Sequence, residues 1–130
     1  MLKNPVLARF PKEGPAVVIR NMRQRNLTSL PVVNDDRQLI GEVRLKDLTK
    51  LRNENIRTIE SAIRTDNLSV GPDTIIEELL PLMMKTNSPI SIVDDNNKVI
   101  GLLPLQWLVI EMTGMERTEI NEIIENSQVE

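Results

Sequence analysis

The side chains available for metal binding or acid/base chemistry in this chain are carboxylates, because its 130 residues include no Cys and no His. Thiol nucleophiles, imidazole bases, disulfides and the usual zinc ligand sets are therefore excluded. The candidates for catalysis are two pairs of adjacent acids, Asp35 with Asp36 and Asp94 with Asp95. Each pair lies in a predicted hairpin turn, where solvated Asp is expected, and no nucleophile, base and orienting group converge on it. The sequence therefore indicates neither an enzyme nor a metal site.

The composition indicates a folded domain with an aliphatic core. Apolar residues make up 40% of the chain, but Phe10 and Trp107 are its only aromatic residues, so the core must consist of Val, Ile, Leu and Met. A surface so poor in aromatic rings is unsuited to stacking on exposed bases, which argues against binding of nucleic acid. No apolar run approaches the roughly 18 residues that span a bilayer, and the first residues do not form a signal peptide. We therefore expect a cytoplasmic protein without a membrane span.

The distribution of charge is more informative than the net charge of −3. Residues 1–65 hold 13 Lys and Arg against 7 Asp and Glu, a net +6; residues 66–110 hold 2 against 6, a net −4; residues 111–130 hold 1 against 6, a net −5. A basic first half beside an acidic second half and tail suggests an anion site or charge attraction between parts of an assembly. The simpler explanation is that these are solvated faces.

The elements that position these charges follow from an internal repeat. Residues 30–41 and 90–101 each consist of an apolar run, an acidic and amide turn, a second apolar run and a glycine, at a constant offset of 60 residues. Repeats of this length are typically tandem copies of one supersecondary unit, and a unit of about 60 residues buries too little surface to be robust alone. We therefore expect two copies, at residues 1–58 and 59–114, that pack on each other, followed by an acidic tail at 115–130.

The first copy is predicted to have the order β-α-β-β-α. Residues 4–10 form an edge strand or an extended lead-in, and Pro15 opens a helix that runs to about residue 25. Strands are predicted at 29–33 and 38–44, and a second helix at 45–51. Gly41 lies inside a strand, where a side chain would obstruct a close neighbour or a ligand. A short helical turn is expected within residues 59–63.

The second copy is predicted to repeat this order. A brief strand at 68–70 precedes a helical apolar stripe at 75–83, which Pro81 should kink or weaken. Strands at 89–93 and 98–104 and a helix at 105–112 follow. Residues 115–130 form an acidic amphipathic helix, which either docks on its own domain or serves as a partner or regulatory tail.

The two copies resemble CBS domains, the regulatory modules named after cystathionine β-synthase. The first copy contains LPVVND at 30–35, LIGEV at 39–43 and KDL at 46–48, where the family pattern has LPVVD, GIVT and RDL. The second contains IVD at 92–94 and VIGLL at 99–103, in register with the first. The resemblance covers nearly all of residues 5–112. It implies a tandem CBS pair, an α+β fold in which two β-α-β-β-α repeats form a pseudo-twofold sandwich.

The same resemblance implies a ligand site, since clefts between CBS repeats often hold adenine nucleotides. Its key positions are a Thr or Ser at the end of the GIVT strand and an Asp three residues later that grips the ribose hydroxyls. The first copy keeps the acid as Asp47 but has Arg44 at the hydroxyl position, whereas the second has Pro104 and Trp107 there. Arg44 and Lys46 are expected to meet a phosphate. The ligand-binding residues assigned in this way are Asp47, Arg44, Lys46, Leu30 and Thr28.

Asp47 and Trp107 also have a structural explanation. A carboxylate such as Asp47 in the first turn of a helix is favoured by the helix dipole. A large ring such as Trp107 packs more often than it binds a ligand. No cofactor is assigned, and the candidate ligands are an adenine nucleotide or cyclic di-AMP.

A narrower resemblance concerns the segments around the repeats. Asn4-Pro5-Val6, Gly14-Pro15 and the stretch IESAI at 59–63 before LSV at 68–70 are similar to the C-terminal region of ATP-binding subunits of glycine betaine/proline ABC importers. In that family a CBS pair follows the ATPase domain and tunes uptake to osmotic conditions, ionic strength or a cyclic dinucleotide. The chain has no G-x-x-x-x-G-K-S/T loop, so it is expected to be a fragment without the ATPase.

Two functions follow as hypotheses. The first is a regulatory module of such a transporter, acting as a homodimer on the ATPase domain and the membrane subunit at the inner face of the cell membrane. The alternative is an adenine-nucleotide or cyclic-dinucleotide sensing CBS module attached to another enzyme or channel.

Overall fold

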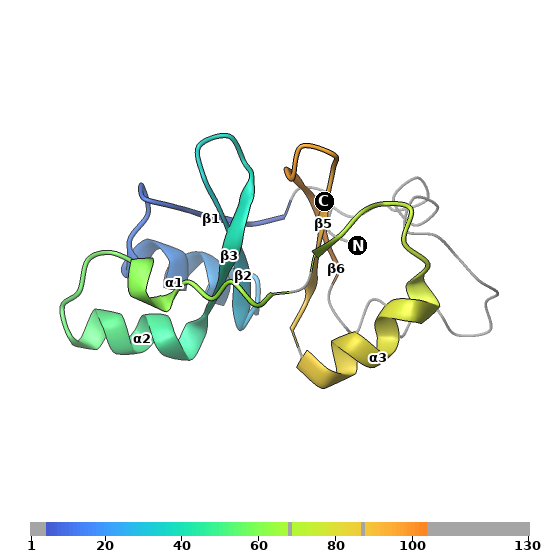
Figure 1. Cartoon of the computed structure of the whole chain (residues 1–130). Coiled ribbons are helices and arrows are strands. Elements are labelled where there is room, and N and C mark those ends of the chain that lie inside the picture. Colours follow the sequence, from blue (N-terminus) through green and yellow to red (C-terminus); the bar gives the residue numbers. More distant parts are fainter. Residues whose placement is uncertain (1–4, 68, 87, 104–130) are drawn as a thin grey trace. The chain divides into compact units, whose positions relative to one another are not determined.

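The computed structural model describes residues 5–67, 69–86 and 88–103 (Figure 1). The contacts within the chain divide it into two units, of which the first is Val6–Asn67 and the second is the rest of the chain. Each unit carries its own three-stranded sheet, and the fold is a mixed α+β fold, as predicted. The second helix of the second copy, Trp107 and the acidic tail lie outside the described residues.

The first unit has the predicted β-α-β-β-α order. Its elements are β1 (Ala8–Arg9), α1 (Pro15–Gln24), β2 (Ser29–Val33), β3 (Leu39–Arg44) and α2 (Leu45–Asn53), followed by the short 3₁₀ helix η1 (Glu60–Ala62). The strand order is β1-β2-β3, with β1 parallel and β3 antiparallel to β2. Only Ala8 and Arg9 of the predicted 4–10 segment pair as a strand, so the rest of that segment is the lead-in.

The helices of the first unit cover its sheet with an aliphatic core. Pro15 starts α1, where its missing amide hydrogen costs no helical bond, and α1 then buries Val18, Ile19 and Met22 at helical spacing. Helix α1 packs against α2 (Figure 1). The buried cluster contains no aromatic residue; it consists of Ala8, Val18, Ile19, Met22, Leu30, Val32, Val43, Leu48, Leu51, Ile59 and Ala62.

The second unit repeats the strand arrangement. Its described elements are β4 (Ser69–Val70), α3 (Ile76–Thr86), β5 (Ile90–Val93) and β6 (Val99–Leu103). The strand order is β4-β5-β6, again parallel and then antiparallel. Pro81 lies inside α3 as the sequence predicted, and the helix continues beyond it to Thr86.

The two β-hairpins have the same turn, 60 residues apart. In the first, Oδ1 of Asn34 accepts hydrogen bonds from the backbone N–H groups of Asp36 and Gln38, both at 3.0 Å. In the second, Oδ1 of Asp94 accepts from those of Asn96 and Lys98, both at 2.9 Å. This is the side-chain-to-backbone capping expected of Asn and Asp in turns, and it confirms the predicted hairpins.

Candidate functional site

Several charged side chains of the first unit lie close together where β3 ends and α2 begins. Glu42 and Arg44 are two residues apart on β3, so they point to the same face of the sheet. Nε of Arg44 lies 3.5 Å from Oε1 of Glu42. That Nε is buried and has no hydrogen-bond partner among the described residues. Glu42 itself is only 6% exposed, and a buried carboxylate is rare unless it is paired.

Asp47, the predicted ribose-binding acid, is held by an arginine from the segment after α2. Nη2 of Arg64 donates to Oδ2 of Asp47 at 2.9 Å, and Nε of Arg64 donates to the same oxygen at 3.2 Å. The side chains are partly accessible, with 28% of Asp47 and 39% of Arg64 exposed. The acid therefore has a cationic partner within its own unit, Val6–Asn67.

The backbone of Arg64 is fixed to the edge of the sheet. Its N–H donates to the carbonyl of Glu42 and its carbonyl accepts from the N–H of Glu42, both at 2.8 Å. Gly41 makes this approach possible, because a Cβ at that position would lie 2.5 Å from the carbonyl oxygen of Arg64. The prediction that Gly41 stands beside a close neighbour is confirmed, and the neighbour is the chain itself.

The other predicted site residues lie at different depths. Lys46 is exposed in the first turn of α2, and Arg44 is the residue that precedes the helix. The exposed Thr28 accepts the backbone N–H of Leu45 at 2.9 Å through its carbonyl, which brings it beside the same turn. Leu30 is fully buried in the core of the unit. Their assignment to a ligand stays a prediction.

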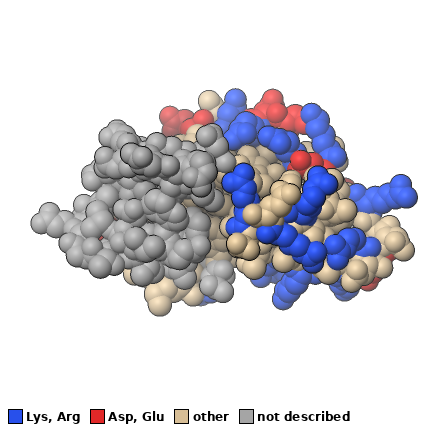
Figure 2. Space-filling model, turned by 180° about the vertical axis from the view of Figure 1, so that it is seen from behind, with Lys and Arg blue, Asp and Glu red and all other residues tan. Residues whose placement is uncertain are grey.

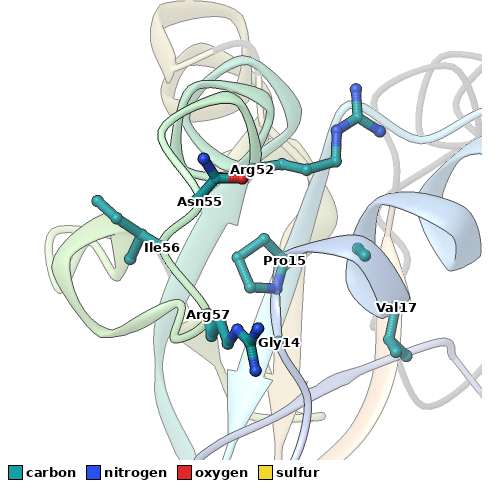
Figure 3. Close-up of a pocket in the computed structure, with 8 residues that line it drawn as sticks. Gly14, Pro15, Val17, Arg52, Asn55, Ile56 and Arg57 are labelled. Atoms are coloured by element: carbon teal, nitrogen blue, oxygen red, sulfur yellow. The ribbon is translucent and has the colours of Figure 1, made fainter.

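The described residues of the first unit line at least two pockets. The first, about 470 Å³, runs along one side of α2 toward η1 and is lined by Asp47, Lys50, Leu51, Glu54, Ile56, Ser61, Ala62 and Arg64. Of the five predicted ligand-binding residues, only Asp47 lines it. The second, about 390 Å³, lies between the start of α1 and the segment after α2 (Figure 3). Its charged lining residues are Arg52 and Arg57, both exposed.

The sequence patterns did not single out Glu42 and Arg64. A charged residue inside an otherwise apolar strand was the available indication for Glu42. Nothing in the spacing indicated Arg64, which is 17 residues from the acid that it binds. Within the described ranges, no group of three or more acidic side chains is placed to hold a metal ion. Of the helices in those ranges, none has both the length and the hydropathy that crossing a bilayer demands.

The arrangement of sheets, hairpins and charged turn can be compared with known proteins. The family model of the CBS domain matches the chain twice, at residues 11–54 and 57–106. This chain belongs to the CBS domain family. Two matches in one chain make it a CBS pair, as the resemblance of the two copies implied.

Curated relatives of this CBS pair include transporter subunits. The glycine betaine/carnitine transport ATP-binding protein GbuA of Listeria monocytogenes is 31% identical over 112 residues, which are 86% of this chain and 28% of that protein. The glycine betaine transport ATP-binding protein OpuAA of Bacillus subtilis is 22% identical over 102 residues, which are 78% of this chain and 24% of that protein. The CBS pair thus spans about a quarter of the length of these relatives.

Solved CBS pairs share the fold. One is CBSX2 in complex with AMP, which superposes with a TM-score of 0.73 at 21% identity and covers 85% of this chain and 89% of that one. This likeness shows the fold of the chain.

Proposed function

We propose that this CBS pair is the regulatory part of an ATP-binding subunit of a glycine betaine-type ABC transporter. The observation that carries the proposal is the match to GbuA, which extends over 86% of this chain at 31% identity. A regulatory module requires an effector that binds one arrangement of the module better than another. In this proposal the module changes its packing and thereby biases the attached ATPase.

Ionic strength is one effector that the charge distribution supports. The first unit exposes many basic side chains, and Figure 2 shows Lys and Arg spread over much of the described surface. Those of the first unit are Arg9, Lys12, Arg20, Arg23, Arg25, Arg37, Lys46, Lys50, Arg52 and Arg57. Their attraction to the acidic part of the chain, which carries a net −9 over residues 66–130 from −4 and −5, weakens as salt screens it. An increase in salt would therefore favour a looser arrangement.

Scattering measured across a salt series tests whether ionic strength is an effector. We expect the radius of gyration or the association state of the chain to change as the Debye length falls from about 30 Å at 0.01 M to about 3 Å at 1 M salt. The double variant Arg20→Gln with Arg23→Gln removes two exposed charges from α1 and should reduce the change. A scattering profile that is constant over the whole series would reject the ionic-strength role.

An adenine nucleotide is the second candidate effector. Asp47 is an accessible carboxylate at the start of α2, it lines a pocket of about 470 Å³, and basic residues lie near it in the chain. The AMP complex of CBSX2 supports this candidate, because that protein has the same fold. In this proposal the ribose hydroxyls donate to Asp47, and cyclic di-AMP is a further candidate ligand. The same site would serve a nucleotide-sensing CBS module attached to another enzyme or channel.

Calorimetry separates the two effectors. The full chain is titrated with AMP, ATP and cyclic di-AMP, and the titrations are repeated with Asp47→Ala. Binding that is lost in the variant favours nucleotide sensing through Asp47. Binding that survives Asp47→Ala unchanged, or no binding at all, would reject it.

The partners that we propose for this CBS pair follow from the proposed transporter subunit. A transporter with two ATP-binding subunits presents two copies of the CBS pair, so we propose a homodimer at the inner face of the cell membrane, next to the ATPase domain and the membrane subunit. The coding sequence upstream of Met1 tests this assignment. An in-frame ATPase domain with a G-x-x-x-x-G-K-S/T loop would support it, and an unrelated domain would contradict it.

A further inference from the structure

Arg64 is hydrogen-bonded to Asp47, the acid on which the proposed nucleotide site depends. Both of its hydrogen bonds, at 2.9 and 3.2 Å, end at Oδ2 of Asp47. Arg64 is the only side-chain partner of Asp47 among the residues that the structure describes. One of the two carboxylate oxygens of Asp47 is therefore already hydrogen-bonded when a ribose with two neighbouring hydroxyl groups reaches the site.

The ion pair can open without a change of the main chain. The backbone of Arg64 stays bonded to Glu42 at the sheet edge through two hydrogen bonds of 2.8 Å. Its guanidinium is 39% exposed and lines the pocket of about 470 Å³, so the side chain has room to change rotamer. The other polar residues of this pocket are Lys50, Glu54 and Ser61.

We propose that Arg64 determines the ligand class of the Asp47 site by exchanging one anionic partner for another. When a ribose diol binds Asp47, the guanidinium leaves the carboxylate and binds a phosphate of the same ligand. A ligand with both a ribose and a phosphate restores the charge-assisted bonds of Arg64, whereas a nucleoside leaves the guanidinium without an anion. The site therefore selects a phosphorylated ribonucleotide over a nucleoside. This inference rests on the proposed nucleotide function.

The selection is measured as a ratio of affinities. The full chain is titrated with AMP and with adenosine, and we expect AMP to bind at least about tenfold more tightly, the scale of one charge-assisted hydrogen bond. In Arg64→Gln, adenosine should bind more tightly than in the wild type, because it no longer displaces an arginine. AMP should bind more weakly, because its phosphate has lost a partner. The ratio should fall to within about threefold.

Two further variants separate the proposal from general effects of charge and folding. Arg52→Gln removes the same charge from an exposed position of α2 outside this pocket and should leave the ratio unchanged. Arg64→Lys keeps the charge but loses the planar pair of donors, so its ratio should lie between those of the wild type and Arg64→Gln. Urea unfolding of each variant verifies that the first unit remains folded.

The outcomes distinguish this inference from the proposed function. If AMP and adenosine weaken equally in Arg64→Gln, or if the ratio stays at the wild-type value, Arg64 does not select the ligand and the inference is overturned, while nucleotide binding stands. If neither ligand binds the wild type or Arg64→Gln, the nucleotide function fails and the inference fails with it. Titration with 2′-deoxy-AMP reports on Asp47, since the loss of one hydroxyl should weaken binding only if the ribose binds that acid.

Discussion

The two repeats of this CBS pair have nearly the same hairpin but different chemistry. Val32 pairs with Gly41 in the first sheet and Ile92 pairs with Gly101 in the second, and a register shift follows immediately in both. The next residue differs, since the first repeat buries the carboxylate of Glu42 where the second buries Leu102. The strand pairing is thus the same whether the residue after the glycine is a carboxylate or an apolar residue.

This difference separates the residues that fold a repeat from those that make it a site. The turn acid or amide, the strand glycine and the buried aliphatic residues occur in both copies. The charged side chains described around Asp47 lie in the first unit, where the chain after α2 returns to the sheet edge and supplies Arg64.

Truncation of the buried methionine in each repeat should have the largest effect on stability. Met22 in α1 and Met83 in α3 are both fully buried. We expect Met22→Ala and Met83→Ala each to lower the free energy of unfolding by about 2–5 kcal/mol, because a cavity remains. Met84→Ala is the matched control, since this neighbouring side chain is 67% exposed. Its effect should stay within about 0.5 kcal/mol in urea denaturation. Equal losses at Met83 and Met84 would contradict the core described for the second repeat.

A methyl group at Gly41 should have the next largest effect. It would lie 2.5 Å from the carbonyl oxygen of Arg64 and 2.6 Å from Cγ2 of Ile63. Neither atom is at the far end of a flexible side chain, so neither can move aside easily. We expect Gly41→Ala to lower the free energy of unfolding by about 1–3 kcal/mol. At Gly71 a Cβ meets no atom within 4 Å, so Gly71→Ala is the control in the same denaturation series. The same substitution at Gly101 then measures whether the second repeat has a similar constraint. A Gly41→Ala variant as stable as Gly71→Ala would refute the close packing of the chain after α2.

Exchange of the turn residues between the hairpins should have the smallest effect. Asn34→Asp and Asp94→Asn both keep an Oδ1 that accepts two backbone hydrogen bonds, so each should change stability by less than about 0.5 kcal/mol. Asn34→Ala and Asp94→Ala lose that acceptor and should each cost about 1–2 kcal/mol. Thermal unfolding of the four variants provides the comparison. Markedly different costs for the two alanine variants would mean that the hairpins are not equivalent.

The sequence by itself determined the elements whose causes are local. Asn34 and Asp94 fix their hairpins through bonds to residues two and four positions away, and Pro15 presets the start of α1. The spacing of the two copies was sufficient to predict two repeated supersecondary units, because a repeated pattern of apolar runs, turn residues and glycines encodes repeated strand pairing. The resemblance of LPVVND, LIGEV and KDL in the first copy to the family pattern then implied the CBS family and its α+β fold. The sequence was also sufficient to place Asp47 at the start of a helix.

Only the tertiary structure decided what Asp47 and Gly41 meet. Both depend on the return of residues 63 and 64 to the edge of β3, and no periodicity within either segment specifies that pairing. The burial of Glu42 and Leu30 likewise depends on which elements cover the sheet. Such contacts join residues that are distant in sequence, so they arise from the packing of the whole unit and not from the preferences of any one stretch of chain.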